Sequence, residues 1–168
     1  MKCHICGEIM QKTKGSYVYR ESGLDNVVLT GITIYKCSCG EKMPEISNID
    51  GLHRVIANAL VKKKTPLSGK EVRFLRKQIG LSAKELAAVL GVNPVTVSRW
   101  ENEIELIGPA NDKLIRMLYI QMIQERCHTV IKDSILYMKS IKPKDRQKPS
   151  KIFIPISSIK NDPCLSFA

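Results

Sequence analysis

The residues of this 168-residue sequence with the most distinctive chemistry are cysteines near the N-terminus. Four of the six cysteines form two close pairs, and each pair is followed by a glycine: Cys3 with Cys6, and Cys37 with Cys39. Two thiolates on a tight turn present soft ligands to one side, and two such turns can surround a metal ion tetrahedrally. The pattern therefore predicts a zinc site made by these four residues.

The second pair departs from the usual spacing, because only Ser38 separates Cys37 from Cys39. This gap strains the turn, so an imidazole from His4 or His53 is an alternative to Cys37 as the fourth ligand. A tetrahedral thiolate site also accepts iron, as in a rubredoxin-like electron carrier. We favour zinc because the rest of the chain has the features of a DNA-binding protein.

A second group of candidates lies in residues 81–101, LSAKELAAVLGVNPVTVSRWE, which have the pattern of a DNA-reading helix-turn-helix. Ser82 and Glu85 form a capping box for the first helix, and Gly91 ends it. Asn93 followed by proline begins the second helix. The apolar positions that join the two helices are Leu86, Ala87, Leu90, Val92, Val97 and Trp100.

The outward side of the second helix carries Thr96, Ser98 and Arg99, whose side chains can contact bases and phosphates. Basic residues are also frequent before these helices. The whole chain has 27 Lys and Arg against 16 Asp and Glu, a formal charge of +11, and phosphate backbones are the commonest reason for such an excess. We therefore expect double-stranded DNA as a ligand.

Several other classes of function lack support in the sequence. There is no phosphate-binding glycine loop, His-Glu-X-X-His helix or serine elbow, so we do not expect an enzyme. The N-terminus lacks the apolar region of a secretion signal, and no window approaches ~18 uninterrupted apolar residues. We expect a cytoplasmic protein with no membrane partner, and this compartment argues against structural disulfides.

Strands must position the cysteines, and helices must position the DNA-reading residues. Residues 16–20 and 27–36 are rich in β-branched and aromatic residues and predict a hairpin between the cysteine pairs. A domain of residues 1–46 has too little apolar burial to fold on its own core, and such short domains usually need a metal, disulfides or a partner. In residues 68–80 a second capping box, Ser68 with Glu71, predicts a helix before the helix-turn-helix.

The remaining segments connect and extend these parts. Residues 47–66 are expected to be a linker with a possible short helix at 49–62. From Pro109 an apolar helical pattern runs to Met138, and its surplus of apolar positions predicts a homodimer interface; a helix that closes its own domain is the alternative. Residues 139–151 are a basic, flexible-looking stretch, and 152–159 could add an edge strand.

The stretches MKCHICGE, YKCSCGE and GLSAKELAAVLGVNPVTVSRWEN occur in the order typical of one family. Over residues 1–122 the chain resembles the MqsA-like, or YgiT-type, antitoxins. The resemblance implies a type II toxin–antitoxin protein, in which a zinc-bound N-terminal domain holds a ribonuclease toxin and a dimeric C-terminal domain represses the operon. The family's metal ligands match Cys3, Cys6 and Cys39, while Cys37 stands one residue out of register.

The resemblance also implies roles on the DNA side. A DNA-contacting arginine of the family corresponds to Arg99, and a polar reader that is often asparagine falls at Val95, which can pack on a thymine methyl group. Lys84 and the amides beyond Ser82 would then contact the phosphate. The complete set of expected DNA-binding residues is Ser82, Lys84, Asn93, Val95, Thr96, Ser98 and Arg99.

Together these observations predict a multi-domain chain. A small zinc-bound β-hairpin (α+β) domain at 1–46 and the linker at 47–66 precede an all-α, Cro- or phage-repressor-like helix-turn-helix domain at 67–122. A helical extension and basic tail occupy 123–168. We expect a sequence-specific repressor and antitoxin; the alternatives are a free-standing regulator without a toxin and a zinc-ribbon adaptor that binds protein.

Overall fold

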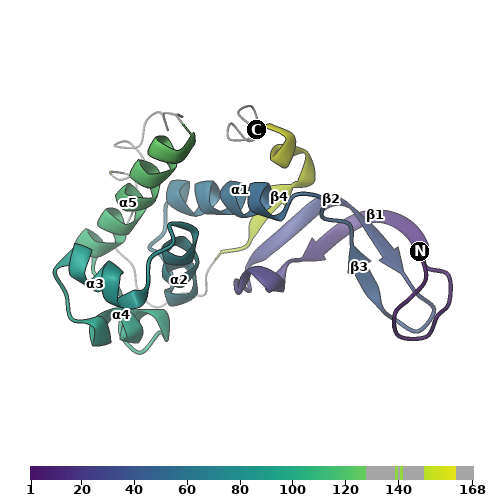
Figure 1. The fold of residues 1–168 in the computed structure, drawn as a ribbon, viewed down its shortest axis with the longest axis horizontal. Coiled ribbons are helices and arrows are strands. Elements are labelled where there is room, and N and C mark those ends of the chain that lie inside the picture. Colours follow the sequence, from purple (N-terminus) through teal and green to yellow (C-terminus); the bar gives the residue numbers. More distant parts are fainter. Residues whose placement is uncertain (128–138, 140, 142–149, 162–168) are drawn as a thin grey trace.

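The computed structural model describes residues 1–127, 139, 141 and 150–161. It is elongated, with a β-sheet at one end, a group of helices at the other and helix α1 (Ile49–Lys62) between them (Figure 1). The two-part fold expected from the sequence is confirmed: a β-strand region with clustered cysteines precedes an all-helical region.

The sheet has four strands, β1 (Gln11–Val18), β2 (Val27–Lys36), β3 (Lys42–Pro44) and β4 (Ile152–Pro155). β1 and β2 form the predicted antiparallel hairpin, and a 3-10 turn at Arg20–Ser22 lies in their connection. On the other edge of β2, β3 pairs antiparallel with the end of β2, and β4 pairs parallel with the start of β2. The C-terminal segment therefore supplies an edge strand to the N-terminal sheet.

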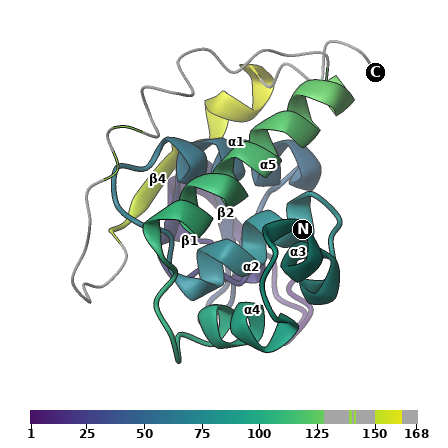
Figure 2. The same cartoon turned by 90° about the vertical axis from the view of Figure 1, so that its left-hand side faces the viewer.

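The helical region contains α2 (Gly69–Gln78), α3 (Ala83–Leu90), α4 (Pro94–Glu101) and α5 (Pro109–Cys127). Its helix starts agree with the sequence, because Ser68 and Ser82 form capping boxes and the Asn93 side chain caps α4. Gly91 ends α3 in the left-handed conformation, with φ 66°, which glycine adopts without strain. Helix α4 lies at the lower edge of the helical part in both views (Figures 1 and 2).

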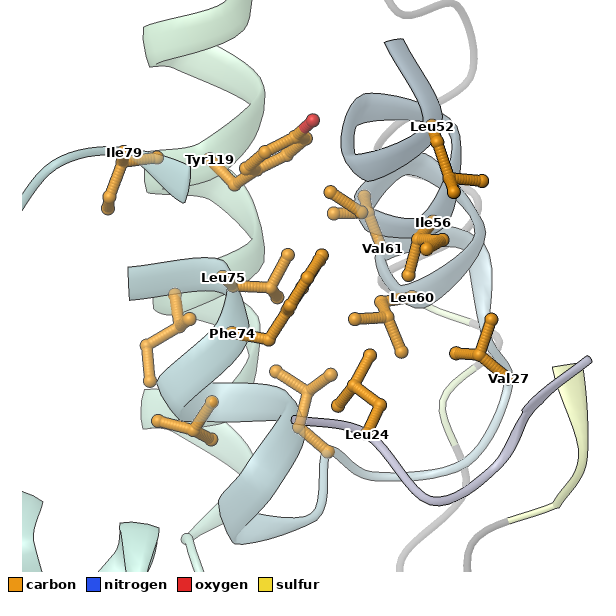
Figure 3. Close-up of a cluster of buried hydrophobic side chains, with 14 of the residues drawn as sticks. Leu24, Val27, Leu52, Ile56, Leu60, Val61, Phe74, Leu75, Ile79 and Tyr119 are labelled. Atoms are coloured by element: carbon orange, nitrogen blue, oxygen red, sulfur yellow. The ribbon is translucent and has the colours of Figure 1, made fainter. Parts of the chain in front are cut away.

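Helix α1 occupies the segment that we expected to be a linker. Its 14 residues begin at the Asn48 cap, and its apolar face is buried at Leu52, Ile56 and Leu60. This face meets Leu24 and Val27 from the sheet side and Phe74, Leu75 and Tyr119 from the helical side (Figure 3). One apolar core thus joins the two parts, because residues spaced at helical intervals cover both of them.

A buried arginine fixes the end of α1 against α5. Arg116 is 0% exposed and donates from Nε to Asp112 Oδ1 at 2.7 Å. Its guanidinium nitrogens also donate at 2.7–3.0 Å to backbone carbonyls in the last turn of α1 and just after it, those of Leu60, Val61, Lys63 and Thr65. Carbonyls at a helix end are short of helical partners, so this side chain supplies donors there while Asp112 pairs its buried charge.

A second buried polar group connects the sheet to α2. Asn26 Nδ2 donates to Glu71 Oε1 at 3.1 Å and to the Ser150 carbonyl at 2.9 Å. Glu71 is also paired with Lys63 and accepts from the Ser68 amide at 2.7 Å. The start of β2, the start of α2 and the C-terminal segment therefore meet at one hydrogen-bonded point.

Two expectations fall partly outside the described residues. The apolar pattern that begins at Pro109 is a helix as far as Cys127, and its continuation at 128–138 is not described. Most of the basic stretch at 139–151 also lies outside the described part of the chain.

Candidate metal centre and nucleic-acid interface

The hairpin register brings the two cysteine pairs together. Gln11 at the start of β1 lies opposite Lys36 at the end of β2. Because one cysteine pair precedes β1 and the other follows β2, both lie at the end of the sheet that is remote from the helices (Figure 1). We call residues 3–8 the first knuckle and residues 37–41 the second knuckle.

The two knuckles close by the same backbone pattern despite their different lengths. In the first, the Cys3 amide donates to the Glu8 carbonyl at 2.8 Å, and in the second the Cys37 amide donates to the Glu41 carbonyl at 2.9 Å. The glycine after each second cysteine donates back to the carbonyl of the first, at 3.0 and 3.1 Å. These glycines have φ of 78° and 93°, so the missing residue shortens the turn without changing how it closes.

All four sulfur atoms lie within 4.8 Å of one another. Cys3 Sγ is 3.7 Å from Cys39 Sγ, and Cys6 Sγ is 3.3 Å from Cys37 Sγ. Tetrahedral zinc with bonds of about 2.3 Å separates its sulfur ligands by roughly 3.8 Å, so small shifts would fit the four thiolates around one ion. The group could hold a metal ion, and Cys37 belongs to it.

The imidazole alternatives are not found in this group. His4 is exposed within the first knuckle and contributes no atom to the cluster. His53 lies on α1, where its Nε2 is 3.0 Å from the Tyr19 hydroxyl and its ring meets the edge of Phe74. The one-residue spacing therefore does not displace Cys37.

The thiols influence each other's protonation. A hydrogen bond from the Cys39 amide, followed by one from Cys6, lowers the pKa of Cys37 to about 6. The pKa of Cys6 is lowered by the backbone at Glu8, but Cys37 and burial outweigh this effect and raise it to about 12. Without a metal, the cluster therefore keeps a thiolate beside a thiol. A metal ion would replace the retained protons.

The second site is the outward face of α4. Its inward face buries Val97 and Trp100 against α3 and α2, where Leu86 and Ala87 are also buried. A Cβ at Gly69, the first residue of α2, would lie 2.1 Å from the Trp100 carbonyl oxygen. The backbones of α2 and α4 thus touch, and this contact fixes the orientation of the outward face.

Most of the expected DNA-binding residues are exposed. Val95 is 57% exposed, Arg99 and Ser98 are exposed, and Thr96 is half-buried. Asn93 is exposed, and its Oδ1 accepts from the Val95 amide at 2.8 Å. In the first turn of α3, Lys84 is exposed, and the hydroxyl of the N-cap residue Ser82 accepts from the Glu85 amide at 3.2 Å. The side-chain oxygens of Ser82 and Asn93 therefore act as helix caps, which leaves Asn93 Nδ2 and the side chains of the other residues available to a ligand.

Two arginines that add to the basic character of the sequence have a structural role. Arg76 donates to Glu101 at 2.6 and 2.9 Å, and Arg73 donates to the same carboxylate at 3.1 Å. Glu101 is 6% exposed; burial raises its pKa, but the bonds from Arg76 and Arg73 outweigh this effect and lower it. These ion pairs tie α2 to the end of α4.

Sequence reasoning missed this arrangement. Lys63 and Lys70 are likewise paired, with Glu71 and Asp25. Residues 67–127 contain nine Lys and Arg and seven Asp and Glu, so most of the excess charge lies elsewhere in the chain. Lys77, Lys84 and Arg99 remain exposed on the helical part. An acidic residue at the end of the second helix was the available signal that some arginines are occupied.

Comparison with known families agrees with this geometry. A family model described as helix-turn-helix matches residues 72–118, which run from α2 into α5. Searches of curated proteins and of solved structures returned no match. Among the residues that the structure describes, no helix is long and apolar enough to cross a membrane. The chain therefore carries a helix-turn-helix domain of a DNA-binding regulator, next to a cysteine cluster that could hold a metal.

Proposed function

We propose that this protein is a sequence-specific transcriptional repressor that reads operator DNA with α4. The observation that carries the proposal is the exposed face of α4, which is fixed from behind by α2 and α3 within the segment that matches the helix-turn-helix model. A helix held in this way can enter the major groove with one face free. Neither of the two sites has the arrangement of a catalytic centre, and we do not propose an enzyme.

Arg99, Thr96 and Asn93 are the proposed base readers. Arginine can pair with guanine at two positions, and hydroxyl and amide groups can bond several base edges. Val95 would contact a thymine methyl group, so the operator differs from one that is read by asparagine at this position. Lys84 and the free amides at the start of α3 would hold a phosphate, as helix N-termini do.

We propose zinc as the ion at the cysteine cluster. Four thiolates with near-tetrahedral spacing are its typical structural ligands, and zinc would stabilise the two knuckles without taking part in a reaction. The knuckles lie at the opposite end of the molecule from α4 (Figure 1). This separation leaves the metal-bound end free to hold a second protein while α4 is on DNA.

A homodimer is the proposed DNA-bound form, because two recognition helices can then meet two half-sites about one helical turn apart. The support is a group of exposed apolar side chains on the loop after α4 and on α5: Ile104, Leu106, Leu114 and Met117. Such side chains next to the reading helix fit a two-fold interface between copies.

The specific role that we propose is that of an antitoxin whose metal-bound end holds a ribonuclease toxin. The support is the order of the cysteine and helix-turn-helix motifs in the sequence. The test is a pull-down with the full chain as bait, together with inspection of the adjacent reading frames. A small ribonuclease-like protein that co-purifies and is encoded next door supports the proposal. If no such protein co-purifies and no such gene lies next door, the protein is a free-standing regulator. Capture of an unrelated protein favours a zinc-ribbon adaptor that binds protein.

The DNA-reading role is tested by Arg99→Ala in a duplex selected from a random pool by the unaltered protein. Loss of a base contact should cost about 1–3 kcal/mol, or roughly 5- to 150-fold in affinity at fixed salt. Lys12→Ala, which removes the same charge from β1, is the matched control. If Arg99→Ala changes the affinity no more than this control does, α4 is not the reading helix.

A further inference from the structure

Two sulfur–sulfur contacts in the cluster run between the knuckles. Cys6 contacts Cys37 at 3.3 Å and Cys3 contacts Cys39 at 3.7 Å, so each contact joins one cysteine from each knuckle. Each of these contacts joins one exposed thiol to a less exposed one. Cys6 is exposed and its contact Cys37 is half-buried, while Cys39 is exposed and its contact Cys3 is buried.

We propose that the cluster is a site of reversible oxidation by hydrogen peroxide, at which two disulfides, Cys3–Cys39 and Cys6–Cys37, form between the knuckles and take the place of the metal ion. The disulfides would close the same end of the sheet that the ion closes. The inference rests on the positions of the sulfur atoms and does not require DNA binding or a toxin.

The short spacing in the second knuckle favours this pairing. A bond between Cys37 and Cys39 would have to close a ring across Ser38 alone. A disulfide needs an S–S distance of about 2.05 Å and a defined dihedral angle, which so small a ring strains. The pairs between the knuckles need only that the two turns move slightly closer.

Exposure assigns a role to each cysteine. In a metal-bound cluster all four sulfurs would be thiolates, so access decides which of them attacks peroxide, and Cys6 and Cys39 are the exposed ones. The O–O bond breaks, the sulfur becomes a sulfenic acid, and hydroxide leaves and takes up a proton as water. The less exposed partner, Cys37 or Cys3, then attacks this sulfur, forms the S–S bond and expels a second water.

Each disulfide therefore removes two electrons from two thiols and reduces one peroxide to two waters, and two peroxides convert the whole cluster. Sulfur in a disulfide is no longer a thiolate ligand, so the ion leaves. A thiol reductant reverses both bonds. The predicted outcome of oxidation is thus a metal-free knuckle end that stays closed.

The experiment uses the full chain with Cys127→Ser and Cys164→Ser, which leaves the four cluster cysteines as the only thiols. After peroxide treatment the protein is digested with trypsin without reduction. Cleavage after lysine gives one peptide of residues 3–12 and one of 37–42. Joined peptides, lighter by four hydrogen atoms than their sum, support the proposal. Two separate peptides, each with an internal disulfide, overturn it, and so do sulfinic or sulfonic acids without disulfides.

Matched double variants resolve which sulfurs pair. Cys6→Ser with Cys37→Ser leaves the pair at 3.7 Å, Cys3 and Cys39. Cys37→Ser with Cys39→Ser leaves Cys3 and Cys6 as the control, which likewise has one buried and one exposed thiol. Faster and more complete disulfide formation in the first variant is expected. Equal rates, or a faster reaction in the control, would show that the contacts in the structure do not direct the oxidation.

Discussion

The knuckle end of the sheet and the helix-turn-helix part are held together in different ways. Among residues 1–10 and 37–46, only Cys3 and Met10 are buried apolar side chains. The helical part instead buries Leu75, Leu86 and Ile115 completely. Burial of apolar area is the main source of folding free energy, so the helical part can fold from its own sequence while the knuckle end depends on a ligand.

The boundary between these two regimes lies within the sheet. Tyr19, Leu24, Leu29 and Ile32 come from the hairpin, but they belong to the core that α1 shares with the helices. The hairpin is thus stabilised by packing at one end and by its cysteines at the other. A domain boundary drawn after the hairpin therefore does not coincide with the change in what stabilises the chain.

Metal removal should have the largest effect on local stability, and it tests where the boundary between the two regions lies. With a chelator and a thiol reductant present, we expect residues 1–10 and 37–44 to lose their protection from amide hydrogen exchange, because the metal ion that would join the two knuckles is removed. Residues 83–101 should keep their protection. Exchange mass spectrometry measures both, and loss of protection in α4 would show that the two regions are not independent.

Replacement of the buried Arg116 should destabilise the helical part. Arg116→Met removes the cation that pairs with the buried Asp112 carboxylate and that donates to four carbonyl groups at and just after the end of α1, and a broken buried pair costs about 3–5 kcal/mol. Lys113→Met, which removes a positive charge from the same helix, is the control and should cost little. Urea unfolding monitored by circular dichroism gives both values. Equal stabilities would mean that Arg116 does not connect α1 to α5.

The contact between α2 and α4 should respond to one added methyl group. In Gly69→Ala the Cβ meets the Trp100 carbonyl, a backbone atom that cannot move alone, so we expect a loss of about 1–3 kcal/mol and weaker DNA binding. Gly108→Ala is the matched control, because nothing lies within 4 Å of its Cβ. Unfolding and DNA titration of the two variants test the contact, and similar behaviour would argue against it.

The smallest expected effect is a loss of stability of the helical part at acid pH. The folded pKa of Glu101 lies below its ordinary value of 4.5, so its carboxylate adds stability above that pH, and this stability is lost as the pH falls through the folded pKa. Glu101→Gln should flatten the acid limb of helical stability, whereas Glu105→Gln, at an exposed position, should not. An unchanged acid limb in Glu101→Gln would contradict the ion-pair role. The measurement is a series of thermal melts between about pH 3 and 7, a range that covers the titration of carboxyl groups.

Local signals made much of the fold predictable. The caps at Ser68, Ser82 and Asn93 and the left-handed Gly91 are determined by neighbours within four residues, and each is found where the sequence indicates. The cysteine pairs were equally readable, because the hairpin between them sets their register. The strength of these predictions comes from short sequence separation.

The features that the sequence did not reveal depend on distant partners. No residue close to Arg76 in the sequence indicates that this arginine forms an ion pair with Glu101, 25 residues later. The i,i+4 spacing of Asp112 and Arg116 was visible, but not the carbonyl groups of α1 that the arginine also reaches. A basic residue in a DNA-binding region is therefore ambiguous until its acidic neighbours in space are known.

The parallel pairing of β4 with β2 has a consequence for the order in which the molecule is made. Leu29 pairs in register with Ile154, which is buried, so the sheet acquires this neighbour only when the ribosome has already produced all of α2 to α5. Domains fold as they emerge, from the N-terminal side. Here the helices can fold first, and β2 gains its parallel neighbour β4 only after all of these helices have been made.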